Sequence, residues 1–156
     1  MGEALRRRIK QESFESPVQE ALLNLLVAAN HVRERFNQEF ARYGITLSQY
    51  NVLRILKGVH PQGHPRGEIA RRMLERAPDV TRLISRLEKR GLVERLSSEE
   101  DGRLSIARIT PKGLKLLEEM RPSLEALHAY FAGRVAPPDR HELSRICEDI
   151  YEESEL

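Results

Sequence analysis

Cysteine, tryptophan and long apolar runs are scarce or missing in this chain of 156 residues. The single cysteine, Cys147, excludes a disulfide within the chain and a zinc site built from several cysteines. No apolar run approaches the roughly 18 residues that a membrane-spanning helix needs. The basic start of the chain is not followed by the apolar core of a signal peptide. We therefore expect a cytoplasmic protein that makes no contact with a membrane.

Signatures of catalysis and cofactor binding are also missing from the sequence. There is no Gly-rich phosphate loop, no nucleophile elbow and no helix motif with two metal-binding histidines. His60 and His64 are four residues apart, but prolines and a glycine surround them and no second cluster of ligands accompanies them. Cys147 lies in an apolar stripe, where a buried and inert thiol is expected. We expect no enzyme activity, no metal and no cofactor.

Charged residues, by contrast, make up 32% of the chain and are unevenly distributed. The net charge is +3 over residues 1–60, +4 over residues 61–112 and −5 over residues 113–156. A basic middle region favours a polyanionic partner, although an ordinary solvated surface has the same composition. Many charges with few aromatics are typical of a helical protein rather than of an all-β sandwich.

The sequence divides into four expected parts. They are a flexible basic arm (residues 1–15), a long helix (16–45), a helix-turn-helix region with strands (46–112) and a set of C-terminal helices (113–156). Ser16 and Pro17 are the residue types favoured at the start of the long helix, and Gly44 suits its end. The apolar stripe of the C-terminal part runs through Pro122, which predicts one kinked helix or two abutting helices.

Two helices carry apolar surface that needs a cover. Residues 21–29 are apolar all round except for Asn24, and such a segment must be covered on several sides. In a chain this short, a partner subunit is the expected cover. The last helix, which we expect to begin at Pro137, carries a second apolar stripe. We predict a dimer interface, in a lobe formed by the first and last helices, at Leu22, Leu25, Leu26, Leu143, Ile146 and Ile150.

The middle region predicts three short helices followed by a small wing of two or three strands. Ser48 is a candidate cap for the first helix, and Asp101-Gly102 is a strong signal for a two-residue hairpin. Alternating residues predict strands on both sides of that turn, over 92–96 and 104–109. The expected fold class is mainly α with a small β wing, a winged helix-turn-helix flanked by a lobe of terminal helices.

The helix expected between Pro78 and Arg90 sorts into two faces. Its apolar residues share one face, whereas Asp79, Arg82, Ser85, Arg86 and Lys89 share the other. A helix that packs with one face and offers guanidinium and hydroxyl groups with the other suits the major groove of DNA. A charged solvent-exposed face has the same pattern, but Arg103, just past the hairpin turn, favours DNA because a basic wing can reach a neighbouring groove.

These segments resemble the winged helix-turn-helix of MarR-type regulators. The similar runs are 67–73 and 80–95. Asp101-Gly102-Arg103 is similar to the family's Asp-x-Arg wing motif, and 109–113 to its Leu-Thr-x-x-Gly exit from the wing. By element order the resemblance covers roughly residues 16–153. It implies a homodimeric bacterial or archaeal DNA-binding regulator, usually a repressor, which in many members a small aromatic or phenolic effector releases by binding between the dimer and DNA lobes.

The resemblance also implies which side chains contact DNA. On the expected recognition helix and wing these are Thr81, Arg82, Ser85, Arg86 and Arg103, with Arg66 and Arg76 as further phosphate contacts. Asp101 is expected to brace the wing. Leu74 and Pro78 replace the family's turn glycine and polar cap residue, which affects base preference. Asp79 either favours the helix N-terminus electrostatically or accepts a hydrogen bond from a cytosine amino group.

The resulting hypothesis is a homodimeric transcription factor. It places two recognition helices in successive major grooves, about 34–36 Å apart, on an imperfect palindrome. Two other classes stay open: a winged-helix dimer that acts through protein contacts without specific DNA binding, and an enzyme or ligand-storage protein that uses a pocket between the lobes. Arg82, Arg86 and Arg103 argue against the former, and the missing catalytic constellation argues against the latter.

Overall fold

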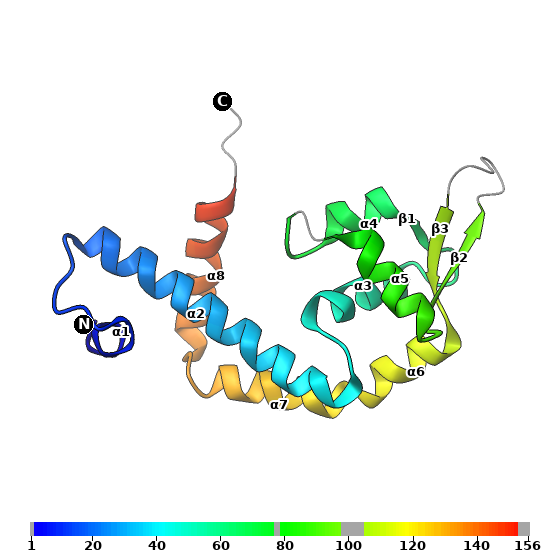
Figure 1. Cartoon of the computed structure of the whole chain (residues 1–156). Coiled ribbons are helices and arrows are strands. Elements are labelled where there is room, and N and C mark those ends of the chain that lie inside the picture. Colours follow the sequence, from blue (N-terminus) through cyan, green and yellow to red (C-terminus); the bar gives the residue numbers. More distant parts are fainter. Residues whose placement is uncertain (1, 77–78, 98–104, 153–156) are drawn as a thin grey trace. The chain divides into compact units, whose positions relative to one another are not determined.

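The computed structural model describes residues 2–76, 79–97 and 105–152 (Figure 1). Their elements, in chain order, are α1 (Glu3–Ile9), α2 (Pro17–Phe40), η1 (Ala41–Tyr43), α3 (Leu47–Gly58), β1 (His64–Pro65), α4 (Arg66–Arg72), α5 (Val80–Lys89), β2 (Val93–Ser97), β3 (Ser105–Ile109), α6 (Pro111–Glu119), α7 (Arg121–Ala132) and α8 (Pro137–Tyr151). The predicted fold class, mainly helical with a small wing sheet, is confirmed. None of the helices in these ranges is long and apolar enough to cross a membrane.

The first residues form a helix where we expected a flexible arm. Leu5 of α1 is only 3% exposed, whereas Arg6, Arg7 and Arg8 are exposed. Burial of one leucine therefore orders a segment whose charges suggested an unstructured arm. Lys10, in the left-handed conformation with φ 55°, ends the helix.

Helix α2 begins at the predicted residues, but it ends at Phe40, before the predicted end at Gly44. The Ser16 hydroxyl accepts a hydrogen bond from the Gln19 N–H at 3.2 Å, and Pro17 is the first helical residue. One turn of 3-10 helix, η1, follows α2, and Gly44 closes it at φ 67°. The left-handed conformation is one that glycine adopts without steric cost, which explains the residue type at this position.

Two compact units divide the chain, residues 1–117 and 118–156. Helix α2 therefore belongs to the same unit as the helix-turn-helix, where we expected it to form a lobe with the C-terminal helices. The reason is direct contact: the Asn37 side chain accepts from the Leu47 N–H at 2.8 Å, and the buried Phe40 ring lies 4.7 Å from Tyr50. This division is made within one chain, so it does not test the predicted interface between two copies.

The core of the first unit lies among α3, α4, α5 and the sheet. Its fully buried apolar side chains include Val52, Leu53, Leu56, Ile69, Leu87, Val93 and Ile109. Thr46, not Ser48, caps α3, because Gln49 completes a capping box by accepting from the Thr46 N–H at 2.9 Å. Ser48 donates instead to the Glu75 carboxylate at 3.1 Å, in the turn between α4 and α5.

The wing sheet has three antiparallel strands in the order β1-β3-β2. Val93 pairs with Ile109 and Ser97 with Ser105, so the two strands predicted on either side of the turn do pair with each other. A two-residue turn at Asp101-Gly102 would place Ser97 opposite Ile106, so the observed register is offset by one residue from that prediction. The turn itself, with Asp101, Gly102 and Arg103, lies outside the described residues. Strand β1 has two residues and was not predicted, because a segment this short carries no alternating pattern.

The stripe that runs through Pro122 belongs to two helices and not to one kinked helix. Helix α6 ends at Glu119 and α7 begins at Arg121, so the stripe belongs to two abutting helices. Pro122 lies in the first turn of α7, where a residue without an N–H costs no hydrogen bond. In the second unit, the predicted interface residues of α8 are exposed, with exposed fractions of 37% for Leu143, 42% for Ile146 and 61% for Ile150.

Candidate nucleic-acid interface

Helix α5 begins one residue after a carboxylate that caps it. The Asp79 side chain accepts a hydrogen bond from the Arg82 N–H at 3.1 Å, so Asp79 is the N-cap. An acceptor at this position satisfies a backbone donor that the helix leaves unpaired and complements the positive end of its dipole. The contact supports the interpretation in which Asp79 favours the helix N-terminus electrostatically, rather than the one in which it accepts from a cytosine amino group. The expected start at Pro78 lies outside the described residues.

The two predicted faces of α5 are present. Val80, Ile84 and Leu87 are buried against the first unit, whereas Thr81, Arg82 and Arg86 are exposed. The packed face holds the helix in place, and the opposite face offers two guanidinium groups and a hydroxyl to solvent. This arrangement has the donors that phosphates and guanine edges accept.

Ser85, the other predicted contact on this helix, is already engaged. Arg95 of β2 donates from Nη2 to the Ser85 hydroxyl at 2.6 Å, and its Nε lies 3.5 Å from the Glu88 carboxylate. Arg95 thus joins the wing sheet to the polar edge of the recognition helix. The sequence reasoning missed it, although strand alternation places Arg95 on the same face of β2 as Val93, which is buried.

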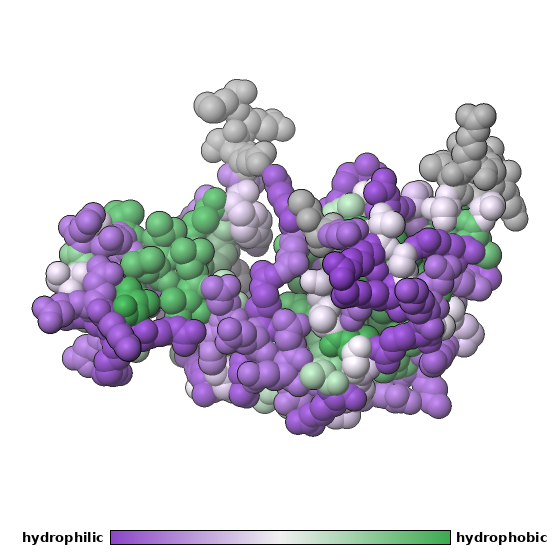
Figure 2. Space-filling view, in the orientation of Figure 1, coloured by the Kyte–Doolittle hydropathy of each residue, from purple (hydrophilic) through white to green (hydrophobic). Residues whose placement is uncertain are grey.

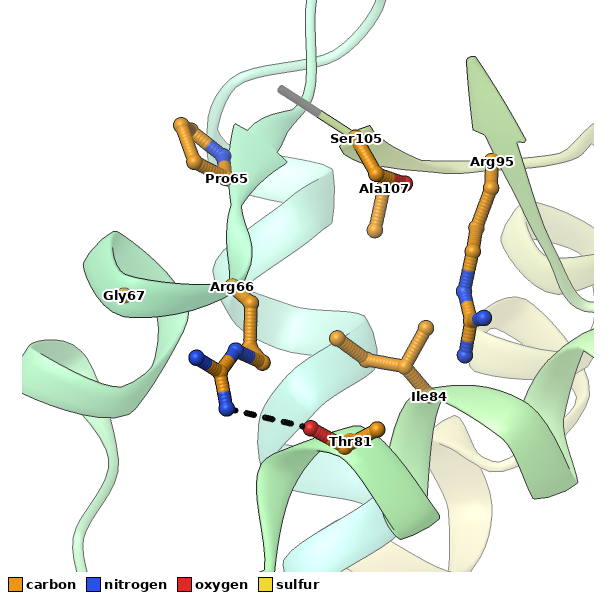
Figure 3. A pocket seen from close by; sticks show the side chains of 8 residues that line it. All are labelled: Pro65, Arg66, Gly67, Thr81, Ile84, Arg95, Ser105 and Ala107. Carbon is orange, nitrogen blue, oxygen red and sulfur yellow. Dashed lines mark hydrogen bonds between the residues drawn. The ribbon is translucent and has the colours of Figure 1, made fainter. Parts of the chain in front are cut away.

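An open groove of about 480 Å³ lies beside the recognition helix (Figure 3). Its lining residues are Pro65, Arg66, Gly67, Thr81, Ile84, Arg95, Ser105 and Ala107. Arg66 and Arg95 enter it from opposite sides, with Ile84 between them. Arg66 donates to the Thr81 hydroxyl at 3.3 Å, so the start of α4 contacts the start of α5. The structure therefore brings Arg66 together with the predicted contacts of α5.

The turn before α5 exposes a large apolar side chain. Leu74, which replaces the family's turn glycine, is 78% exposed, while its N–H donates to the Asn51 side chain at 2.8 Å. Arg76 follows it and is also exposed, and its side chain takes part in an interaction. The two remaining predicted residues, Asp101 and Arg103, lie in the segment that the structure leaves undescribed.

Helix α4 carries a cluster of opposite charges. Arg71 and Arg72 both donate to the Glu68 carboxylate, Arg72 from Nε at 2.6 Å. These hydrogen bonds lower the pKa of Glu68 from 4.5 to about 2. The Glu68 carboxylate is therefore ionised near pH 7, and it neutralises part of the positive charge of α4.

No metal site is evident in the described ranges. They contain no group of three or more histidine, cysteine, aspartate or glutamate side chains that could hold a metal ion. Cys147 is half-buried on α8. The prediction that the protein holds no metal stays an expectation.

A helix-turn-helix with a cationic recognition helix, followed by an antiparallel wing, defines the winged helix-turn-helix class of DNA-binding proteins. Residues 43–104 match the model of the MarR family. A MarR transcription factor from Planctomyces limnophilus is 38% identical, with a TM-score of 0.69, and the similarity covers 87% of this chain and 98% of that one. The chain therefore belongs to the MarR family of transcriptional regulators, and it is not an enzyme.

Two further proteins are similar to this chain. The HTH-type transcriptional regulator MhqR of Bacillus subtilis is 27% identical over 95 residues, which are 61% of this chain and 64% of MhqR. BpsR of Bordetella bronchiseptica, whose DNA binding is regulated by 6-hydroxynicotinic acid, has a TM-score of 0.78. It is 22% identical, over 92% of this chain and all of that one, and so shows the shared fold alone.

Proposed function

We propose that the protein binds operator DNA as a homodimer and represses transcription in the cytoplasm. The observation that carries the proposal is helix α5, which is buried through Val80, Ile84 and Leu87 and exposes Arg82 and Arg86 on its other face. A helix held in this way can enter the major groove without unfolding any part of its domain. The regulated DNA binding of BpsR supports the proposal through the shared fold.

Each subunit would contact DNA through one recognition helix and one wing. Two copies of α5 would lie in successive major grooves, about 34–36 Å apart, so the operator would be an imperfect palindrome. Arg82 and Arg86 would reach bases or phosphates from the exposed face, and Thr81 with Arg66 would contact the backbone at the start of the helix. Ser85 would act through its hydrogen bond with Arg95. Arg76 and Arg103 are proposed as phosphate or groove contacts, and Asp101 as the brace of the wing.

Exposed apolar side chains support the dimer. On α2, Val18, Leu22 and Leu26 are exposed by 76%, 55% and 52%, and Leu25 is half-buried. Figure 2 shows apolar atoms gathered over the N-terminal half of α2. Contiguous apolar surface of this kind usually marks an interface. We therefore propose that a second copy covers Leu22, Leu25 and Leu26 of α2 and Leu143, Ile146 and Ile150 of α8.

A small aromatic effector completes the proposal. The regulation of BpsR by 6-hydroxynicotinic acid supports an effector of this chemical class. Any ligand that filled the groove beside α5 would lie against Arg66 and Thr81, two proposed DNA contacts. Binding there would therefore compete with DNA.

The test is selection of bound fragments from the source genome by the purified protein, followed by a footprint at physiological salt. We expect a protected palindrome of two half-sites one helical turn apart. Binding that is independent of sequence, or no binding by the ligand-free protein, would contradict the proposal. Either result would favour a winged-helix dimer that acts through protein contacts.

A further inference from the structure

The C-terminal end of the recognition helix is hydrogen-bonded to a segment far away in the sequence. Arg90, the residue that ends α5, donates from Nη1 to the Gly44 carbonyl at 2.7 Å and from Nη2 to the Tyr43 carbonyl at 2.8 Å. Both carbonyls belong to the turn that follows α2. The guanidinium fork therefore joins the end of α5 to the end of α2, across more than 40 residues of sequence.

The same end of α5 is also tied to the start of α6. The Arg90 carbonyl accepts from the Lys112 ammonium at 2.8 Å, and the Gly91 carbonyl accepts from the Thr110 hydroxyl at 2.6 Å. Helices α2 and α6 are the elements through which the chain enters and leaves the winged helix-turn-helix. Residues 90–91 thus connect the recognition helix to the end of α2 and to the start of α6.

The backbone at Tyr43 and Gly44 has a conformation that suits its hydrogen bonds with Arg90. Gly44 has φ 67°, and a Cβ atom there would lie 3.3 Å from Arg90 Nη1. The left-handed conformation turns the chain at η1, where the Tyr43 and Gly44 carbonyls accept from the two ends of one planar guanidinium. An ammonium group, being a point donor, cannot span two such acceptors with the same geometry.

We propose that Arg90 is a positioning residue for DNA recognition, which sets the orientation of α5 relative to α2 and α6. The inference rests on the proposed function, since it concerns how the exposed face of α5 is presented to DNA. Each Nη atom of Arg90 donates one hydrogen bond to a carbonyl, and on this ground we place its contribution in the helix rather than in a phosphate contact. Arg86, one turn earlier on the exposed face of α5, is proposed instead as a direct DNA contact.

The experiment compares Arg90→Ala and Arg90→Lys with Arg42→Ala as a matched control. Arg42 lies in η1 and pairs with Glu39 at 3.3 Å within the same segment, so its loss removes one charge but no link to α5. Affinity for the selected operator and for an unrelated duplex is measured at several salt concentrations. Amide hydrogen exchange of each free protein is measured in parallel, and thermal melting confirms that each variant folds.

For Arg90→Ala we expect operator affinity to fall on the order of tenfold, as for the loss of charge-assisted hydrogen bonds. Affinity for the unrelated duplex and the slope of log K against log salt should stay unchanged. Arg90→Lys keeps the charge but should recover only a small part of the affinity. Amides of residues 43–45 and of the last turn of α5 should exchange faster in both variants, and those of Arg42→Ala should not.

Three results would overturn the positioning role. Full recovery in Arg90→Lys, or a salt slope lowered by about 0.9 per subunit in Arg90→Ala, would show a direct phosphate contact. Unchanged amide exchange would show that the two hydrogen bonds do not hold α5, whatever the DNA result. If Arg90→Ala does not fold, Arg90→Lys carries the test. A wild-type protein that selects no DNA would instead contradict the proposed function.

Discussion

Side chains on the recognition helix differ in whether they are hydrogen-bonded within the protein or extend into solvent. Asp79 is held by the Arg82 N–H and Ser85 by Arg95, whereas Arg82 and Arg86 extend from the exposed face. A side chain already hydrogen-bonded within the protein is held in one orientation and has fewer donors or acceptors left for a base. The exposed arginines are therefore the first candidates for readout, and the engaged residues are candidates for support.

Arg86→Ala should cost roughly 1–3 kcal/mol of binding free energy on the true operator, as expected for loss of a bidentate contact with guanine. The loss on an unrelated duplex should be smaller, because only the operator offers that base at the right place. Fluorescence titration of both duplexes measures the two losses. An equal loss on every duplex would show that Arg86 contacts phosphate alone.

Asp79→Ala should lower the free energy of unfolding by roughly 0.5–2 kcal/mol, the usual effect of removing an N-cap. Asp79→Asn should leave stability nearly unchanged, because the amide oxygen also accepts from the Arg82 N–H. Urea denaturation measures both values. If Asp79→Asn keeps its stability but changes the preferred base at one operator position, the carboxylate accepts from a cytosine and is more than a cap.

At the scale of elements, the helix-turn-helix is anchored to its neighbours on both sides of α5. Arg33 of α2 pairs with Glu75 in the turn before the helix, and Ser48 of α3 donates to the same carboxylate. Arg90 attaches the far end of α5 to the turn after α2. The recognition helix is thus connected at each end to the region around α2, so a displacement of α2 would displace α5.

Helix α4 should show a pH-dependent contribution from Glu68. Its pKa is lowered from 4.5 to about 2 in the folded protein, so the stabilisation is complete above pH 4.5 and is lost as the pH falls toward 2. The difference in melting temperature between wild type and Glu68→Gln should therefore shrink over this range. It should be small even at pH 7, because the pairs are at the surface. A difference that does not change with pH would rule out the carboxylate charge as its cause.

For the whole molecule, charge and apolar surface are separated along the chain. The middle region is basic, the last part is acidic, and most of the exposed large apolar side chains lie on α2 and α8. A polyanion attracts the middle region and repels the last one, which agrees with DNA contact through the winged helix-turn-helix. The apolar side chains need a partner of the same character, and the proposed second copy would supply one.

Leu22→Asp combined with Ile146→Asp should dissociate the dimer, because burial of unpaired carboxylates at an interface is costly. Sedimentation velocity measures the mass in solution. Leu74→Asp is the control, since Leu74 is exposed but lies in the turn before α5. A double variant that sediments as the wild-type dimer would place the interface elsewhere.

DNA affinity should fall steeply with salt concentration. A dimer that makes about 6–10 phosphate contacts should give a slope of log K against log salt near −5 to −9. Binding isotherms at four or five salt concentrations provide the slope. A flat response would mean that few phosphates are neutralised, and the DNA-binding proposal would fail.

Local features of the fold could be read from the sequence. The start of α2 at Ser16 and Pro17, the left-handed turn at Gly44 and the two faces of α5 depend on residues a few positions apart. Caps and helical faces arise from such short-range contacts, so the residue types themselves predict them. The cap of α3 was placed two residues late because Thr46 and Ser48 are both suitable, and only Gln49 decides between them.

Contacts between distant segments were decided by the tertiary structure alone. Arg90 binds carbonyls that every residue possesses, Arg95 takes the hydroxyl of Ser85 from another element, and Leu5 is buried in a segment that looks like a charged arm. The sequence by itself determined most of the elements, the basic recognition face and the family. Which of those side chains stay exposed to meet DNA, and which hold the helix in place, depends on the path of the whole chain, because a hydrogen bond forms only where folding brings donor and acceptor within about 3 Å.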